Sequence, residues 1–193
     1  VRGEVRIENA NAIDPDALIR RLTERYRPDD AVTPIFDPNV PGKVLRWTDK
    51  DGENLDWSDP VWREGETANF DERARCEYED HVTNALCYLG FHDAAFEVNL
   101  DLIPESQRTD LVIRLIDEGK PAKLTRIKVH GNKRSSTPAI VDYLNIPVGA
   151  ILTSVQLIQV RHALWLSGRF VSSTVELEKE KDGHALRLTV HEA

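Results

Sequence analysis

The sequence contains two copies of one pattern, about 122 positions apart. The first copy begins at Val5 and the second at Ile127. Each start is followed at the same spacing by three apolar residues: Ile7, Leu18 and Leu22 in the first copy, and Val129, Ile140 and Leu144 in the second. An internal repeat predicts two copies of one supersecondary unit.

Each copy continues into an Ala-Leu helix that ends at a glycine followed by a phenylalanine, and then into two strands of alternating polarity. The sequence therefore predicts an α+β fold of two tandem β-α-α-β-β units. Each unit is expected to be a three-stranded mixed sheet covered by two antiparallel helices. The expected domains are residues 1–119 and 120–193, and 193 residues suffice for two such cores.

In the first unit, Val5 and Ile7 share one face of a strand over residues 4–8. Asp14 as N-cap and Pro15 at the first helical position predict a helix that runs to about Tyr26. A second helix over residues 71–89 is expected to stop at Gly90. The strands that follow have these expected inward or apolar residues: Phe96, Val98, Leu100 and Leu102 in one, and residues 111–116 in the other.

In the second unit, residues 124–129 predict a strand and residues 137–144 a helix. Thr153 or Ser154 is expected to cap the next helix, whose packing residues are Leu157, Val160, Leu164 and Trp165. Residues 171–179 and 184–191 predict a hairpin about Lys181-Asp-Gly183. Its expected inward residues are Val175, Leu177, Leu186, Leu188 and Val190.

The expected topology follows from these elements. Two antiparallel helices return the chain to the end of the sheet where it started, so strand two runs opposite to strand one. The hairpin then makes strand three antiparallel to strand two and places it centrally, which gives the order one, three, two. Strand two is left at an edge, with unpaired backbone groups.

Residues 27–69 form an insertion that the second unit lacks, rich in Pro and Asp and carrying Trp47, Trp57 and Trp62. Residues 43–47 and 54–57 predict a strand pair closed by an Asp-Gly turn at 49–52. A calcium loop at the same acids is disfavoured, because the glycine stands at the wrong offset for an EF-hand.

Composition narrows the function classes. The net charge of −8 and the interleaving of Lys and Arg with acids argue against nucleic-acid binding. Cys76 and Cys87 lie too far apart on one expected helix to bridge, so we expect both to be packing residues. The apolar stretch over 143–160 is interrupted by Pro and Gly and predicts two helices instead of a membrane span. The chain starts at Val1 and lacks Met, so we expect a piece of a longer protein.

The second unit resembles a POTRA (polypeptide-transport-associated) domain over its whole length. The resemblance rests on these motifs in order: Ile127-Lys-Val129-His-Gly131-Asn132, Gly149, Ser167-Gly168-Arg-Phe170 and Val190-His-Glu192. The first unit is similar to a more divergent copy. It keeps Leu89-Gly90-Phe91 and Glu118-Gly119-Lys-Pro, but has Asn9-Ala10 where the turn glycine is expected.

Tandem POTRA units resemble the periplasmic arms of BamA- and TamA-type outer-membrane assembly proteins. The resemblance implies a C-terminal β-barrel in the full-length protein, and partners that are unfolded outer-membrane or secreted polypeptides or subunits of an assembly complex. Two alternatives stay open, the arm of a two-partner secretion transporter and a structural spacer that docks partner subunits. A division protein with a single POTRA domain fits less well.

Our leading hypothesis is that extended peptides add as a further strand beside strand two, since backbone pairing is nearly independent of client sequence. The expected peptide-binding residues are Phe96, Val98 and Leu100 in the first unit and Thr174, Glu176 and Glu178 in the second. The alternative is that these strands only pack inward, with outward charges that block edge pairing.

A second hypothesis makes Trp47, Trp57 and Trp62 anchors for a partner subunit, because aromatic residues in polar surface loops commonly mark interfaces. The alternative is a loop that buries its own tryptophans.

No nucleophile elbow, phosphate-binding loop or zinc-helix motif is found in the sequence. The histidines are scattered, at positions 81, 92, 130, 162, 184 and 191, and His130 beside the Gly131 turn is expected to be a loop residue. We therefore expect a non-enzymatic protein without catalytic residues, cofactor or metal ion.

Overall fold

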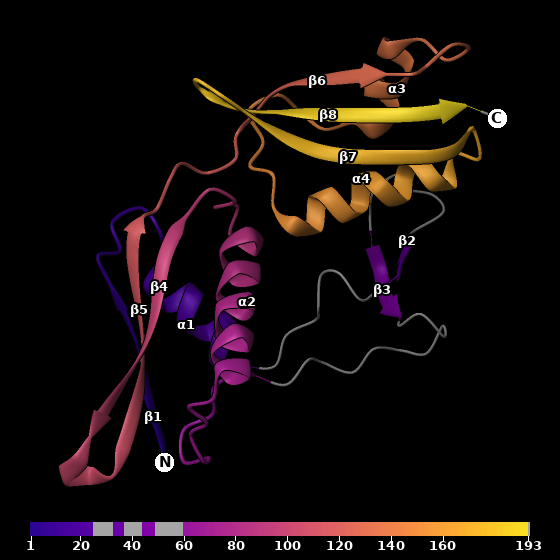
Figure 1. The fold of residues 1–193 in the computed structure, drawn as a ribbon. Helices are drawn as coiled ribbons and strands as arrows, with labels where there is room; N and C mark the ends of the chain where they lie inside the picture. The colour runs from indigo at the N-terminus through magenta and orange to yellow at the C-terminus, as the bar shows by residue number, and fades with distance from the viewer. Residues whose placement is uncertain (25–32, 37–43, 49–59, 193) are drawn as a thin grey trace. The chain divides into compact units, whose positions relative to one another are not determined.

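The computed structural model describes residues 1–24, 33–36, 44–48 and 60–192 (Figure 1). Contacts divide the chain into two compact units. Of the described residues, 1–24 and 60–120 belong to the first unit, and 33–36, 44–48 and 121–192 belong to the second. A separate two-stranded sheet pairs β2 (Thr33–Phe36) antiparallel to β3 (Val44–Thr48).

The first unit holds one sheet and two helices, whose bounds are β1 Arg2–Glu8, α1 Pro15–Thr23, α2 Glu72–Tyr88, β4 Ala95–Ile103 and β5 Arg108–Asp117. A short 3-10 turn, η1 (Pro104–Ser106), joins β4 to β5. The strand order is β1-β5-β4, with β1 parallel and β4 antiparallel to the central β5. Figure 1 shows α1 and α2 on the same face of this sheet.

The second unit repeats this order, with bounds β6 Leu124–His130, α3 Thr137–Leu144, α4 Ser154–Leu166, β7 Phe170–Glu180 and β8 Gly183–Glu192. Its strand order is β6-β8-β7, with β6 parallel and β7 antiparallel to β8. The β-α-α-β-β unit, its duplication and the order one, three, two are thereby confirmed.

The helices begin where the capping residues predict. The carboxylate of Asp14 accepts the N–H of Asp16 ahead of α1, and that of Asp71 accepts the N–H of Ala74 at 2.7 Å ahead of α2. Thr153 caps α4, as one of the two residues expected to do so. At the end of α2, Gly90 takes a φ of 90° and Phe91 N–H donates back to the Leu86 carbonyl, which stops the helix.

Each unit has its own apolar core between helices and sheet. Fully buried residues of the first core include Leu18, Leu22, Val82, Leu111 and Ile113, and those of the second include Leu152, Leu164, Leu186, Leu188 and Val190. Burying one such side chain contributes about 1.5–3 kcal/mol. The expected inward residues of the β7–β8 hairpin all belong to the second core or pack against it.

The terminal glutamate of each unit caps the same loop. Oxygens of Glu118 accept the backbone N–H groups of residues 11, 12 and 13. Oxygens of Glu192 accept those of residues 133, 134 and 135, at 2.6 Å for Lys133 and 2.7 Å for Ser135. The repeated closing motif therefore fastens the end of the central strand to the loop between strand one and helix one.

The turn after strand one needs a left-handed backbone in both units. Gly131 has a φ of 83°, and a Cβ there would stand 2.2 Å from the Val190 carbonyl oxygen. The matching residue of the first unit, Asn9, adopts a φ of 64°. Asn tolerates this conformation better than most residues, which explains how the first unit does without the glycine.

Several expected positions differ. Cys76 is exposed and Cys87 half-buried, because the buried stripe of α2 runs through Ala74 and Tyr78 instead. Leu102 is 63% exposed near the β4–β5 turn, beyond the reach of the helices, and Trp165 is 69% exposed in the last turn of α4. The first helix ends at Thr23, before Tyr26.

The strand expected over 43–47 is present as β3, and its partner among the described residues is β2. The expected partner at 54–57 and the Asp-Gly turn at 49–52 lie outside the described residues.

Candidate polypeptide-binding strand edges

Each three-stranded sheet has two outer strands, β1 and β4 in the first unit and β6 and β7 in the second. The free side of an outer strand presents unpaired N–H and C=O groups, which can bind another extended chain. The two outer strands of each sheet differ in whether another segment of the chain is hydrogen-bonded to their free side.

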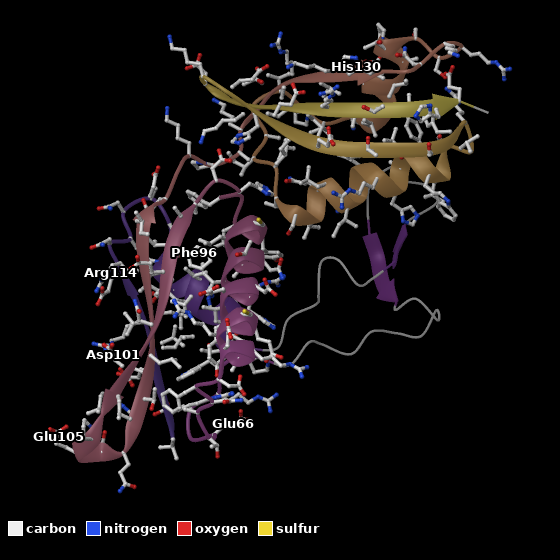
Figure 2. All side chains as sticks on the ribbon, in the orientation of Figure 1. Glu66, Phe96, Asp101, Glu105, Arg114 and His130 are labelled. Carbon is white, nitrogen blue, oxygen red and sulfur yellow. The ribbon has the colours of Figure 1, made fainter. Side chains whose placement is uncertain are left out.

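The side of β1 is closed at its start. Arg2 N–H donates to the Glu66 carbonyl at 2.7 Å, and Gly65 N–H donates to the Arg2 carbonyl at 2.9 Å. Gly65 adopts a φ of 86°, a conformation that favours glycine. Residues 62–66, which we call the first strap, thus occupy this edge; Figure 2 labels Glu66 within it.

The side of β6 is closed by the same pair of bonds. Leu124 N–H donates to the Ala150 carbonyl at 2.8 Å, and Gly149 N–H donates to the Leu124 carbonyl at 2.7 Å. Gly149 has a φ of 93°, close to that of Gly65. Residues 149–152, the second strap, therefore cover the start of β6 as the first strap covers the start of β1.

Trp62 anchors the first strap. Its side chain is 1% exposed, and its Nε1–H donates to the Gly3 carbonyl at 2.8 Å. The ring packs edge-on against Tyr78, with centroids 5.6 Å apart. Trp62 is thus a core residue and unavailable as a surface anchor, which corrects its expected docking role. The side chain of Trp47 and all of Trp57 lie outside the described residues.

The opposite sides, at β4 and β7, are open. Beyond their ladders with β5 and β8, no backbone hydrogen bond reaches β4 or β7 from any residue that the structure describes. These strands are nine and eleven residues long. An extended peptide can therefore pair along either of them.

On β4, the three expected residues face the core. Val98 is 3% exposed, while Phe96 and Leu100 are partly buried against the same core. Glu97, Asn99 and Asp101 alternate with them and are exposed. Figure 2 shows Phe96 toward the helices, with Asp101 and Arg114 on the other face of the sheet. The expected β4 residues would therefore contribute backbone groups to a bound strand.

On β7, the expected residues lie on the solvent face. Thr174 and Glu176 are exposed. Glu178 is held across the sheet by Lys128 Nζ at 2.6 Å and Arg187 Nη1 at 3.0 Å. The hydrogen bond from Lys128 is the main cause that lowers the pKa of Glu178. Glu178 thus joins β7 to its neighbours and is already engaged by them.

Glu180 extends this charged face. Its carboxylate accepts hydrogen bonds from Arg126 at 2.6 Å and from the Thr125 hydroxyl at 2.8 Å. These two partners, with Lys128, lower the pKa of Glu180 to about 2. The outer face of the second sheet is therefore tied together by ion pairs, while the backbone edge of β7 stays open.

None of the helices in the described part of the chain is both long and apolar enough to span a membrane. Within residues 1–24, 33–36, 44–48 and 60–192, no three His, Cys, Asp or Glu side chains lie close enough together to hold a metal ion.

Of the comparisons with known proteins, the one with solved structures identifies the fold. No protein-family model matches the sequence, and no relative is found among curated proteins. Among solved structures, BamA from Haemophilus ducreyi lacking POTRA domains 1–3 is similar over 67% of this chain and 25% of that one, with 15% identity and a TM-score of 0.51.

Two further solved structures are similar at lower scores. BamA POTRA3–5 from Haemophilus influenzae matches over 64% of this chain and 49% of that one, with 15% identity and a TM-score of 0.48. POTRA1–2 of the periplasmic domain of Omp85 from Anabaena matches over 100% and 95%, with 14% identity and a TM-score of 0.47.

The element order, the two strand orders and the Haemophilus ducreyi likeness together define a tandem POTRA fold. The resemblance expected from the sequence is confirmed at the level of the fold. The chain spans a quarter of the length of the BamA structure it matches.

Proposed function

We propose that this chain is a non-enzymatic periplasmic arm of an outer-membrane assembly or protein-translocation factor. In this role it binds extended client or partner polypeptides, which add as a further strand beside β4 or β7. The tandem POTRA fold supports the class, and a C-terminal β-barrel in the full-length protein completes the proposal.

The single observation that carries the binding mode is the difference between the two sides of each sheet. Both straps close the start of strand one with the same pair of hydrogen bonds, while no described residue outside the sheet forms a backbone hydrogen bond with β4 or β7. Exposed edges favour aggregation unless they are covered or used. We therefore explain the open edge at the same place in both units by the addition of a client strand there.

Backbone pairing also suits the proposed clients. Main-chain hydrogen bonds supply affinity with little dependence on side chains, so one edge serves many sequences. The inward-facing side chains of β4, such as Val98, are buried and cannot read the client directly.

Site-directed disulfide trapping tests this mode. Cys76 and Cys87 are first replaced by Ser, and a single cysteine is placed at Asn99 on β4 or Thr174 on β7. The probe is a ten-residue peptide of alternating Val and Thr with one central cysteine. Paired neighbouring strands bring Cβ atoms to about 4.5–5.5 Å, close enough for disulfide formation with small adjustment.

Matched controls carry the cysteine where the first strap covers the edge, at Arg2 on β1, or on a helix, at Arg73 or Arg75. We expect several-fold higher cross-linking yields at positions 99 and 174 than at these three. Equal yields at all five positions, or the highest yield at position 75, would show that clients do not add to the open edges.

We retain Trp47 and Trp57 as proposed docking residues for a partner subunit, on the composition of the insertion. Replacing both by Ser should weaken capture of that partner while leaving peptide cross-linking at positions 99 and 174 unchanged.

A further inference from the structure

A cavity of about 260 Å³ opens on the second unit where α3, the end of α4 and the start of β7 meet. Its wall is polar and apolar in equal parts, and its main lining residues are Ile140, Tyr143, Leu166, Ser167, Arg169 and Phe170. Leu166 is 53% exposed and Tyr143 is 42% exposed, although both are large apolar side chains. The cavity thus combines exposed apolar side chains with a polar wall that holds one cation.

Hydrogen bonds hold this surface in shape. Tyr143 Oη donates to the Ala163 carbonyl at 3.2 Å, which fixes the ring against α4. Ser167 Oγ donates to the Leu164 carbonyl at 2.6 Å and accepts the Arg169 N–H at 3.3 Å. The turn that carries Arg169 is therefore ordered without a ligand, which lowers the cost of binding one.

Residues 121–193 carry a positive net charge of their own. Residues 121–193 hold ten Lys and Arg against six Asp and Glu, a net charge of +4 in a chain of −8. Two of those acids, Glu178 and Glu180, are engaged on the outer face of the sheet, and Glu192 caps a loop.

One of these cations, Arg169, lines the cavity, and Arg161 lies earlier on α4. Arg161 and Arg169 form no ion pair with any residue that the structure describes. The only acid on α3 or α4 is Asp142. A ligand that complements this site carries a negative charge beside an apolar group.

We propose that this cavity docks a polypeptide partner through one apolar side chain that fills it, while a neighbouring carboxylate of the partner pairs with Arg169. An apolar anchor in a pocket with a charge-assisted hydrogen bond at its rim is a common hot-spot arrangement. Exposed Trp165 and Val171, next in sequence to Leu166 and Phe170, add apolar contact area. The site includes Phe170 and Val171 at the start of β7 but none of the residues expected to bind a client strand, and it goes beyond the strand addition proposed above.

Fluorescence anisotropy on the full chain tests the proposal with a labelled Gly-Ser peptide that carries one Phe between two pairs of Asp. We expect Arg169→Glu to weaken binding about tenfold, since a lost charge-assisted bond is replaced by repulsion. Leu166→Gln should weaken it several-fold. Peptides with Phe replaced by Ala, or Asp by Asn, should bind more weakly to the unchanged protein.

Matched controls separate the site from general effects. Lys181→Glu makes the same charge change in the β7–β8 turn, at the other end of β7, and Val148→Gln makes a similar polar change at a residue 72% exposed. Both should bind the probe as the unchanged protein does. If Arg169→Glu shows no cooperative thermal unfolding, the variant is not folded. Arg169→Gln is then used in its place.

Three results would overturn the proposal. The first is equal affinity for the Arg169 and Leu166 variants and their controls. The second is undiminished binding of the Asn peptide. The third is a dimer seen by sedimentation that Arg169→Glu dissolves, because the occupant is then a second copy of this chain.

Discussion

Glu118 and Glu192 show how a single carboxylate sets the geometry of each unit. Each accepts three consecutive backbone N–H groups, which would otherwise lack a partner in a turn that leaves the sheet. Burial opposes ionisation of Glu118, but the N–H groups of residues 11–13 lower its pKa overall. In the sequence, both residues end a unit at equivalent positions. The hydrogen bonds that they accept from the backbone are seen only in the structure.

Replacing Glu192 by Ala should lower the urea midpoint of the second unit, because three N–H groups lose their acceptor. Glu176→Ala, an exposed acid of the same sheet, is the matched control and should change the midpoint little. Indistinguishable midpoints for the two variants would contradict the capping role.

Glu192 should also contribute to the acid sensitivity of the second unit. Its pKa is lowered to about 2, first by the Ser135 N–H, with further donation from Arg134 and Lys133. Because the folded pKa lies below the ordinary value of 4.5, the stabilisation is fully present above about pH 4.5 and is lost as pH falls toward 2. Urea titrations of Glu192→Gln between pH 2 and 6 should show a weaker pH dependence than those of the unchanged chain.

A methyl group at Gly131 should be poorly tolerated. Its Cβ would meet the Val190 carbonyl at 2.2 Å, and its φ of 83° adds strain, so Gly131→Ala should cost about 1–3 kcal/mol in unfolding free energy. Gly168, with a φ of 63° and open space around it, is the control for the backbone cost alone. Gly131→Ala should therefore be the more destabilising of the two in urea unfolding.

At the scale of elements, a strap covers the start of one edge strand in each sheet. The first strap is held by Trp62 and by two backbone bonds to β1. Trp62→Ala should cost about 3–5 kcal/mol, as expected for truncation of a fully buried aromatic residue. It should also speed hydrogen exchange at the Arg2 and Gly65 amides.

Trp165, at 69% exposure, is the control for Trp62. Trp165→Ala should change stability by no more than about 0.5 kcal/mol. If both substitutions had equal effects, or if exchange at Arg2 were unchanged by Trp62→Ala, the strap would not depend on its tryptophan.

The elements themselves could be predicted well, because their signals are local. Asp14-Pro15 and Gly90-Phe91 each act within one helical turn, and the alternation around Val175 acts within one strand. The burial of Trp62 and the exposure of Trp165 could not be predicted, since each depends on where distant segments pack. The straps were missed for the same reason, although Gly65 and Gly149 in matching places were a readable signal.

At the scale of the whole molecule, the two units are joined by a very short connection. Gly119 N–H donates to Asp117 in the first unit, while Ala122 is fully buried in the second and its carbonyl accepts Leu152 N–H. Only Lys120 and Pro121 lie between these fixed points. Because proline restricts its own φ, this connection has few backbone torsions about which one unit could turn relative to the other.

Insertion of four glycines between Lys120 and Pro121 should broaden the distance distribution between spin labels, one in each unit, measured by double electron-electron resonance. The urea midpoints should stay unchanged, because each unit has its own core. A lowered midpoint would show that the units stabilise each other.

The straps also limit how copies of this protein can self-associate. A fibril that grows by strand pairing needs two free edge strands on every subunit. One pairs with the preceding copy and the other with the following copy. In each sheet, the start of one edge strand, β1 or β6, is already hydrogen-bonded to a strap of the same chain. Where a strap covers the start of strand one, a second copy cannot pair its own edge strand, which limits edge-to-edge association at that end of each sheet.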